Sequence, residues 1–383
     1  MRAVTTYLDN NATTRVADEV MAAMTPFYRD YFGNAHAIHS LGRRAHDAVE
    51  DSRAEVALLL GCDASEVIFT SCGTEGNALV IRGLIDRAAE RRKVVTTSVE
   101  HPSVLSLLRA LERAGQIEVA VVPVDSDGAI DLDAMKAAID DRTLLVSVML
   151  AQNETGVLHP VDKIADLAHA RGALIHVDAV QAAGKVPLSK PALGADFLTI
   201  SGHKFHAPKG VGALTIRKGL TLQPLWYGGG QELGLRSGTE PVPSIVGLAT
   251  AARLAREALA SFDKIETLRD RLESALLAIG ETSVNGASQP RVGNTANISF
   301  HDIAADELVR ALDAEGVCVS AGAACHSGKV EPSGTMKAMQ KPLRVAMGAV
   351  RFSLSRYTTE AEIEHAIATV HPVVARLRAN VMA

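Results

Sequence analysis

Two charged residues, each placed just after a run of apolar residues, give the first indication of chemistry in this chain. Lys204 follows the run FLTIS, and Asp178 follows the run ALIHV, 26 residues earlier. A lysine can hold the aldehyde of pyridoxal phosphate as a Schiff base, and an aspartate can keep the pyridine nitrogen protonated so that the ring accepts electrons. The pair therefore predicts amine chemistry on an amino acid, with pyridoxal phosphate as the cofactor.

The elements that must position these residues alternate between short strands and longer helices from about residue 45 to 220. The expected strands are apolar, β-branched runs, namely EVIFT (66–70), KVVTTSV (93–99), EVAVVPV (118–124), TLLVSVML (143–150), ALIHV (173–177), FLTIS (197–201) and GALTIR (212–217). Such alternation is typical of an α/β unit with a largely parallel sheet covered on both faces. We therefore expect a mostly parallel, seven-stranded sheet.

A Gly- and Pro-rich stretch at 227–244 ends this alternation. Beyond it the sequence predicts a helical segment near 244–280, strands at 294–300, 317–322 and 350–355, and helices near 304–315 and 359–379. This pattern favours a smaller α+β unit. We expect a large domain over 15–255 and a small domain over 256–383 together with 1–14.

Polar residues follow five of the expected strands at their carboxyl ends, where open α/β sheets bind ligands. They are Gly73 with Thr74, His101, Asn153, Asp178 with Gln181, and His203 with Lys204. Each has an ordinary explanation by itself, such as a helix cap, a structural histidine or a loop hydrogen bond. All of them together at equivalent strand ends favour a binding site, with the Gly-Thr helix start holding a phosphate.

The four cysteines, at 62, 72, 318 and 325, form no CxxC pair and no zinc-finger spacing. Cys325 lies in SAGAACHSGK, where the neighbouring His326 and Lys329 favour the nucleophilic thiolate. Cys318 lies in an expected strand, and we expect it in the core. An arginine in VRFSLS, Arg351, could capture a carboxylate with two parallel hydrogen bonds.

Composition excludes some classes of function. The chain has 39 Lys and Arg against 44 Asp and Glu, which argues against nucleic acid as a partner. No apolar stretch reaches the roughly 20 residues of a membrane helix. The N-terminal MRAVTTYLDNNATT has no apolar signal region. We expect a cytoplasmic protein.

The ordered motifs YLDNNATT, TSCGTEGN, EHPSV, NETG, HVDAVQAAGK, SGHKFHAPKGVGAL, GGGQELGLRSGTE, SAGAACHSG and VRFSLSRYT cover essentially the whole chain. Together they resemble the cysteine desulfurases of fold type I pyridoxal phosphate enzymes, most closely the NifS-like branch of the NifS/IscS family. The resemblance implies L-cysteine as substrate, L-alanine as product, and sulfur supplied as a persulfide for iron–sulfur cluster assembly, in this branch for nitrogenase clusters.

The resemblance also implies roles around the cofactor. Lys204 would form the Schiff base, Asp178 would pair with the pyridinium nitrogen, and Gln181 would bond the phenolic oxygen. His101 would stack on the ring and move protons. The phosphate would be held by Gly73, Thr74, Ser201 and His203, with Thr239 reaching the phosphate of a neighbouring subunit in a homodimer.

For substrate and sulfur, the resemblance implies that Asn153 and Arg351 bind cysteine and that Cys325 carries the persulfide. Through that persulfide Cys325 could ligate an iron–sulfur species during transfer to a NifU-like or IscU-like scaffold protein. Ser or Thr commonly follows this cysteine in the family, whereas the present chain has His326.

Two alternatives stay open. Another fold type I enzyme, such as an aminotransferase or a selenocysteine lyase, would use the same cofactor residues, although an aminotransferase needs no nucleophilic cysteine. A sulfur or cluster carrier that uses Cys325 alone would leave Lys204 and Asp178 without a role.

Overall fold

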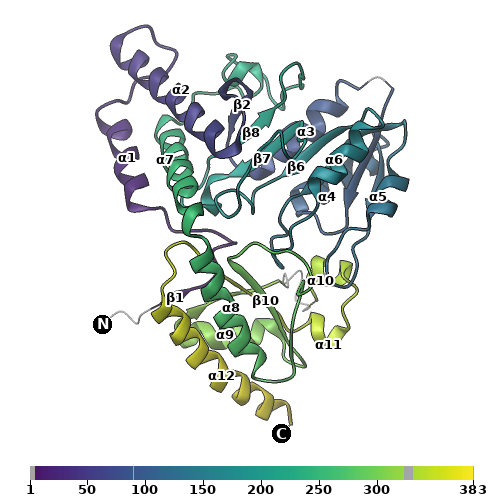
Figure 1. Ribbon diagram of the computed structural model, residues 1–383. Helices are drawn as coiled ribbons and strands as arrows, with labels where there is room; N and C mark the ends of the chain where they lie inside the picture. The colour runs from purple at the N-terminus through teal and green to yellow at the C-terminus, as the bar shows by residue number, and fades with distance from the viewer. Residues whose placement is uncertain (1–4, 89, 323–330, 383) are drawn as a thin grey trace.

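The computed structural model describes residues 5–88, 90–322 and 331–382, with side chains described up to residue 379. Its largest sheet has seven strands (Figure 1), in the spatial order β2 (Val67–Thr70), β8 (Gly212–Ile216), β7 (Phe197–Ser201), β6 (Leu174–Asp178), β5 (Thr143–Met149), β3 (Lys93–Thr97) and β4 (Glu118–Val122). The four pairs from β7 to β4 are parallel, and β8 runs antiparallel to both of its neighbours. The prediction of a mostly parallel seven-stranded sheet is confirmed.

Helices cover both faces of this sheet. One face packs against α3 (Gly73–Ile85) and α4 (Pro102–Arg113), and the other against α1 (Asp18–Arg29), α2 (Ser40–Leu60), α5 (Leu132–Ala138), α6 (Val161–His169) and α7 (Val242–Ala258). Along β5 the apolar side chains alternate between the two faces of the sheet. Leu145 packs on the face covered by α3 and α4, and Val146 and Val148 pack on the opposite face. Each fully buried side chain of this kind contributes roughly 1.5–3 kcal/mol. No helix in the described part of the chain is long and apolar enough to cross a bilayer.

A second, smaller sheet lies in the lower part of Figure 1 and has its own core. Its strands, in spatial order, are β12 (Ser320–Ala321), β13 (Ala349–Ser353), β10 (Thr295–Phe300) and β9 (Thr282–Val284), all paired antiparallel. The helices of this half are α8 (Asp263–Leu277), α9 (Ala305–Ala314), α10 (Gly334–Ala338), α11 (Leu343–Ala346) and α12 (Glu360–Met382). Phe300 and Phe352 are fully buried in this second core.

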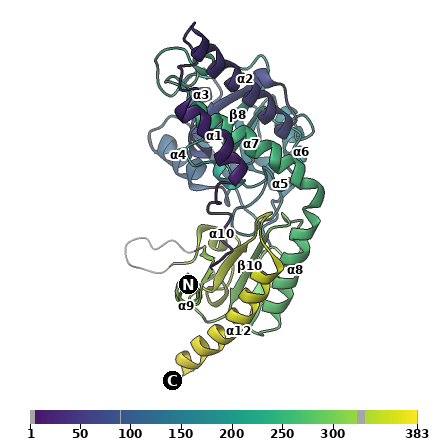
Figure 2. The ribbon, with the colours of Figure 1, turned by 90° about the vertical axis from the view of Figure 1, so that its left-hand side faces the viewer.

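Two connections join the halves. Helix α7 packs on α1 and α2, a short 3₁₀ turn at Leu259–Ser261 follows, and α8 then packs on α12, so the pair spans the molecule lengthwise (Figure 2). The N-terminal segment is the other connection, because β1 (Thr6–Tyr7) pairs in parallel with β11 (Val317–Cys318) and Leu8 lies in the second core. The residues after Leu8 therefore run between the two halves.

The structure differs from the sequence-based expectations in the second half. The helical segment expected at 244–280 is two helices, α7 and α8, and the strand expected at 317–322 is divided into β11 and β12 in different sheets. Cys318 was expected in the core, which is wrong. Among the described strands β11 pairs with β1 alone, in a two-stranded sheet. Cys318 is partly exposed there, and its Sγ lies 3.5 Å from Asp313 Oδ1.

Candidate active site

A cavity of about 390 Å³ opens at the carboxyl ends of the parallel strands, a volume within the usual range for small-molecule sites. Ten of the residues predicted from the sequence line it, namely Gly73, Thr74, His101, Asn153, Asp178, Gln181, Ser201, His203, Lys204 and Arg351. All but Arg351 come from the large sheet and its connections. Arg351 comes from β13 in the second sheet, so the cavity lies between the two halves.

The start of helix α3 provides a place for an anion. A Cβ atom at Gly73 would lie 2.6 Å from Val180 Cγ2, so only glycine allows this close approach of α3 to the residues after β6. Backbone N–H groups at the start of a helix favour a phosphate. The hydroxyl of Ser201 faces the same cavity and has no hydrogen-bond partner among the described residues although it is buried. These groups fit the phosphate of a cofactor.

Asp178 ends strand β6 and is only 6% exposed. Its Oδ1 accepts from the backbone N–H of Val180 at 3.0 Å, and its Oδ2 accepts from Asn77 Nδ2 at 2.8 Å. Burial raises the pKa of this carboxyl above its usual value. A cation placed beside the carboxylate would offset that desolvation, so Asp178 fits a protonated pyridine nitrogen.

Lys204 lies in the 3₁₀ turn Gly202–Lys204 directly after β7. Its Nζ donates to the backbone oxygens of Asn11 and Ala12 at 2.7 and 2.8 Å. Burial and then the nearby charge of Arg351 lower the pKa of Lys204 to about 8. The lowered pKa increases the neutral fraction of the amine at physiological pH, and the neutral amine is the form that attacks an aldehyde.

Gln181 is held by Asn11, which also lines the cavity, and by Lys185, which does not. Its Nε2 donates to Asn11 O at 2.8 Å, and its Oε1 accepts from Lys185 Nζ at 2.5 Å. The same Lys185 amine donates to Asn11 Oδ1 at 2.8 Å. Burial, followed by the charges of Lys204 and Arg351, lowers the pKa of Lys185 well below its usual value. The orientation of the Gln181 amide is therefore fixed by a buried amine.

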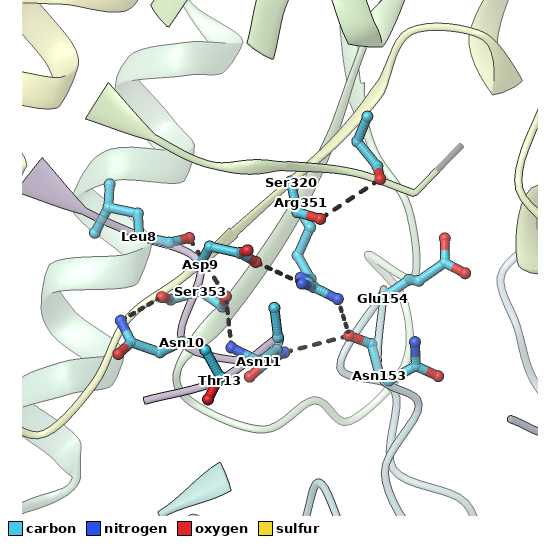
Figure 3. A network of polar contacts seen from close by, with 12 residues as sticks. Leu8, Asp9, Asn10, Asn11, Thr13, Asn153, Glu154, Ser320, Arg351 and Ser353 are labelled. Atoms are coloured by element: carbon cyan, nitrogen blue, oxygen red, sulfur yellow. Dashed lines mark hydrogen bonds and ion pairs between the residues drawn. The ribbon is translucent and has the colours of Figure 1, made fainter. Parts of the chain in front are cut away.

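Arg351 is 7% exposed and lies in a polar network with the N-terminal segment (Figure 3). Its Nη2 donates to Asp9 Oδ1 at 2.6 Å, and its Nη1 donates to Asn153 O at 2.9 Å. Asn11 Nδ2 reaches the same Asn153 oxygen at 3.3 Å. The guanidinium thus faces the cavity as a positioned cation, which suits the carboxylate of an amino acid.

His101 and His203 enter the cavity from different elements. His101 is the N-cap residue of α4, and its Nδ1 accepts from the backbone N–H of Ser103 at 3.1 Å. His203 Nδ1 lies 3.1 Å from Thr13 Oγ1. Burial lowers the pKa of both rings, that of His203 to about 4. His203 is therefore neutral at physiological pH, and the shift at His101 favours its neutral form.

Two predicted residues are not brought to this cavity. Thr239 is exposed in the loop before α7 and does not line the cavity of its own chain, so its contact with a neighbouring subunit stays a prediction. Cys325 lies outside the described residues, and so does its predicted part in iron–sulfur ligation. Within the described ranges, no three His, Cys, Asp or Glu side chains converge as a metal site.

Four residues of the site were missed by the sequence reasoning. Asn11, Asn77, Ser103 and Lys185 contact the predicted residues directly. Asn11 lies in the motif YLDNNATT near the N-terminus. Asn77, Ser103 and Lys185 lie in motifs that also hold predicted residues, which are TSCGTEGN, EHPSV and HVDAVQAAGK in that order. Motif membership was the available signal, although their partners come from distant parts of the sequence.

Comparison with known proteins shows the family to which this chain belongs. Residues 6–365 match the family model described as aminotransferase class-V. A protein named cysteine desulfurase 2 from Trichormus variabilis is 48% identical over 374 residues, which is 97% of this chain and 94% of that protein. Cysteine desulfurase NifS from Azotobacter vinelandii is 46% identical, with 97% and 93% covered. A solved structure titled NifS-like protein superposes with a TM-score of 0.91 at 38% identity, covering 98% of this chain and 100% of that one.

The fold and the lining of the cavity define a fold type I enzyme of the pyridoxal phosphate class. The chain belongs to the class-V aminotransferase family, and within it to the cysteine desulfurases that include NifS. The predicted enzyme class and family are confirmed, and these relatives do not favour an aminotransferase or a selenocysteine lyase.

Proposed function

We propose that this chain converts L-cysteine to L-alanine with bound pyridoxal phosphate and takes the released sulfur as a persulfide on Cys325. The observation that carries the proposal is one cavity shared by Lys204, Asp178 and Arg351, from two different sheets. A nucleophilic amine, a buried carboxylate and a carboxylate-binding guanidinium are what cofactor and amino acid require together.

The chain's own residues would hold the cofactor in four places. Lys204 would bind its aldehyde, Asp178 its ring nitrogen and Gln181 its phenolic oxygen. The phosphate would lie at the start of α3, with Gly73, Thr74, Ser201 and His203 around it. When bound, the cofactor supplies an electron sink for negative charge at the substrate Cα.

Substrate cysteine would be oriented by Arg351 and Asn153. Arg351 donates to Asp9 from Nη2 and to the Asn153 backbone oxygen from Nη1. Each of these nitrogens carries a second N–H, and Arg351 lines the cavity, so the guanidinium keeps donors for the substrate carboxylate. Holding that carboxylate fixes the position of the Cα–H bond relative to Lys204, and such orientation can supply a large part of a rate enhancement.

Proton transfer would fall to Lys204 and His101. Because its pKa is lowered to about 8, Lys204 can take a proton from the substrate carbon as a neutral amine and return it as an ammonium. A positioned proton-transfer group contributes roughly 10²–10⁴-fold. The Cys325 thiolate would then attack the substrate sulfur, so that the S–S bond forms as the C–S bond breaks. The electron pair of the C–S bond would stay with the substrate carbon, which takes up a proton to become the methyl group of alanine.

The setting of the reaction is also proposed. We infer a homodimer in which Thr239 completes the partner's phosphate site, and a NifU-like or IscU-like scaffold as the sulfur acceptor, in support of nitrogenase clusters. NifS among the relatives supports this role. A cytoplasmic location and the division into domains at 15–255 and 256–383 with 1–14 are part of the proposal, and the separate core of the second sheet supports the division.

The test is product analysis with L-cysteine as the sole substrate. We expect alanine and sulfide in equal amounts in the presence of a reductant, with no requirement for a keto acid. Alanine formation that depends on an added keto acid would indicate an aminotransferase instead. A protein that binds no pyridoxal phosphate and only carries sulfur on Cys325 would support the carrier alternative.

A further inference from the structure

The hydrogen bonds around His101 restrict where its proton can lie. The backbone N–H of Ser103 donates to His101 Nδ1 at 3.1 Å, as part of the N-cap of helix α4. A backbone amide can only donate, so Nδ1 must present its lone pair. In the neutral imidazole the proton is then on Nε2, for which no hydrogen-bond partner is present among the described residues.

The hydroxyl of Ser103 strengthens this assignment. Ser103 Oγ lies 2.8 Å from His101 Nδ1, and Asn77 Nδ2 lies 3.0 Å from the same Oγ. Asn77 Nδ2 also donates to Asp178 Oδ2 at 2.8 Å. The reversed amide would place an oxygen against the carboxylate, so the NH₂ group of Asn77 must face both partners. Since Asn77 donates to Oγ, the hydroxyl hydrogen of Ser103 is free to point at Nδ1.

The surroundings of Nδ1 disfavour the protonated, cationic form of His101. A second ring proton would have to sit on Nδ1, where it would face the backbone N–H and the hydroxyl hydrogen of Ser103. The ring also caps the N-terminus of the 12-residue helix α4, where the helix dipole disfavours a cation. Burial and the charge of Lys204 act in the same direction, and Asp178 acts in the opposite one.

We propose that Ser103 is a positioning residue which, with Asn77 and the first turn of α4, holds His101 as the neutral Nε2–H tautomer. The chemical consequence rests on the proposed function. His101 presents a hydrogen-bond donor to the cavity and cannot act there as a base in its resting state. Removal of the substrate Cα proton is therefore assigned to Lys204, and His101 is left to donate a hydrogen bond or a proton from Nε2.

The proposal is tested by ¹⁵N NMR of the full chain labelled at histidine, measured both without cofactor and with pyridoxal phosphate. The His101 signals are assigned by their loss in His101→Gln. In the wild type we expect Nδ1 to resonate as an unprotonated ring nitrogen and Nε2 as a protonated one. This readout does not depend on activity, so a protein that fails to convert cysteine would overturn the proposed function and leave the tautomer result intact.

Matched variants separate the hydroxyl from the rest of the helix. Ser103→Ala should shift the neutral population toward the Nδ1–H tautomer by roughly three- to tenfold, the worth of one hydrogen bond, and should raise the pKa of His101. Ser103→Thr, which keeps the hydroxyl, should restore both values. Ser106→Ala removes an exposed hydroxyl from the same helix and should change neither.

Two results would overturn the proposal. One is a wild-type spectrum in which His101 Nδ1 carries the proton. The other is a Ser103→Ala protein with the same tautomer population and the same pKa of His101 as the wild type.

Discussion

Lys204 combines burial with a neighbouring cation, and both favour its neutral form. The pKa of about 8 means that the amine is mostly protonated below this pH and mostly free above it. Because only the free amine attacks an aldehyde, the rate of cofactor capture should rise with pH with a midpoint near pH 8. Stopped-flow absorbance of the cofactor-free protein mixed with pyridoxal phosphate measures this.

The Arg351 charge is one of the causes of that lowered pKa, so Arg351→Gln should move the midpoint of cofactor capture to higher pH. Arg356→Gln is the control, because Arg356 lies over the Tyr357 ring and is not among the causes of the Lys204 shift. A midpoint near the ordinary lysine pKa of about 10.4 in the wild type would contradict the proposed electrostatics.

Arg351 should also determine the affinity for substrate. A guanidinium can bind a carboxylate with two parallel hydrogen bonds, and a lysine cannot copy this geometry. Arg351→Lys should therefore raise KM for cysteine by tenfold or more, about 1.4 kcal/mol, while pyridoxal phosphate stays bound. Steady-state kinetics measure the effect, with Arg356→Lys as the control. An unchanged KM would show that another group holds the carboxylate.

At the scale of elements, the segment after β1 connects the site to the second sheet. Asn11 in this segment accepts from Lys204, Gln181 and Lys185. Lys185→Met would leave the buried Oε1 of Gln181 without this donor, and such a group costs roughly 1–3 kcal/mol. We expect a lower free energy of unfolding by that amount and weaker binding of pyridoxal phosphate, measured by urea denaturation of the cofactor-free protein and by titration.

Lys209→Met is the matched control for that variant, because Lys209 is an exposed lysine in the loop after Lys204. It should change neither quantity. If Lys185→Met had the stability and the cofactor affinity of the wild type, the buried amine would have no positioning role for Gln181.

The elements of the large sheet could be predicted because each carries its own signal. Buried parallel strands are apolar runs, and β7 at Phe197–Ser201 was predicted to the residue. Strands β1 and β9 are only two and three residues long, too short to show a period. The site residues at strand ends followed from the same reasoning, since parallel strands bring their carboxyl ends to one edge.

The contacts of Asn11 could not be derived in this way. Its partners Gln181 and Lys204 are 170 and 193 residues away. The pairing of β1 with β11 and the bridge from Asp9 to Ser353 in β13 bring the segment to them. The Ser103–Asn77 contact likewise depends on α3 and α4 packing on the same face of the large sheet. Neither spacing nor hydropathy contains that information.

At the scale of the whole molecule, the proposed chemistry is divided between the two halves. Most of the cofactor residues lie at the ends of strands of the large sheet, whereas Arg351 comes from β13 in the second sheet. In the sequence, Cys325 lies between β12 and α10. Cys325→Ala should therefore bind pyridoxal phosphate like the wild type and still take up cysteine, since neither step uses this thiol. Alanine production should fall by orders of magnitude.

Cys318→Ala is the control for this variant. Its thiol is partly exposed with Sγ near Asp313, so its loss should cost at most about 1 kcal/mol of stability and leave turnover intact. Alanine production by the Cys325 variant at the wild-type rate, measured by amino-acid analysis, would rule out a persulfide on this cysteine.

The central claim is that the cavity between the two halves holds pyridoxal phosphate through Lys204. Among the described residues, two lysines donate to Asn11, namely Lys204 at the cavity and Lys185 behind Gln181. Either amine could therefore be the attachment point of the cofactor. The most direct measurement is borohydride reduction of the cofactor-loaded protein, followed by peptide mapping with mass spectrometry. We expect the pyridoxyl group on Lys204 alone and no stable label in Lys204→Ala. A label on Lys185 or on any other lysine would contradict the assignment of this site.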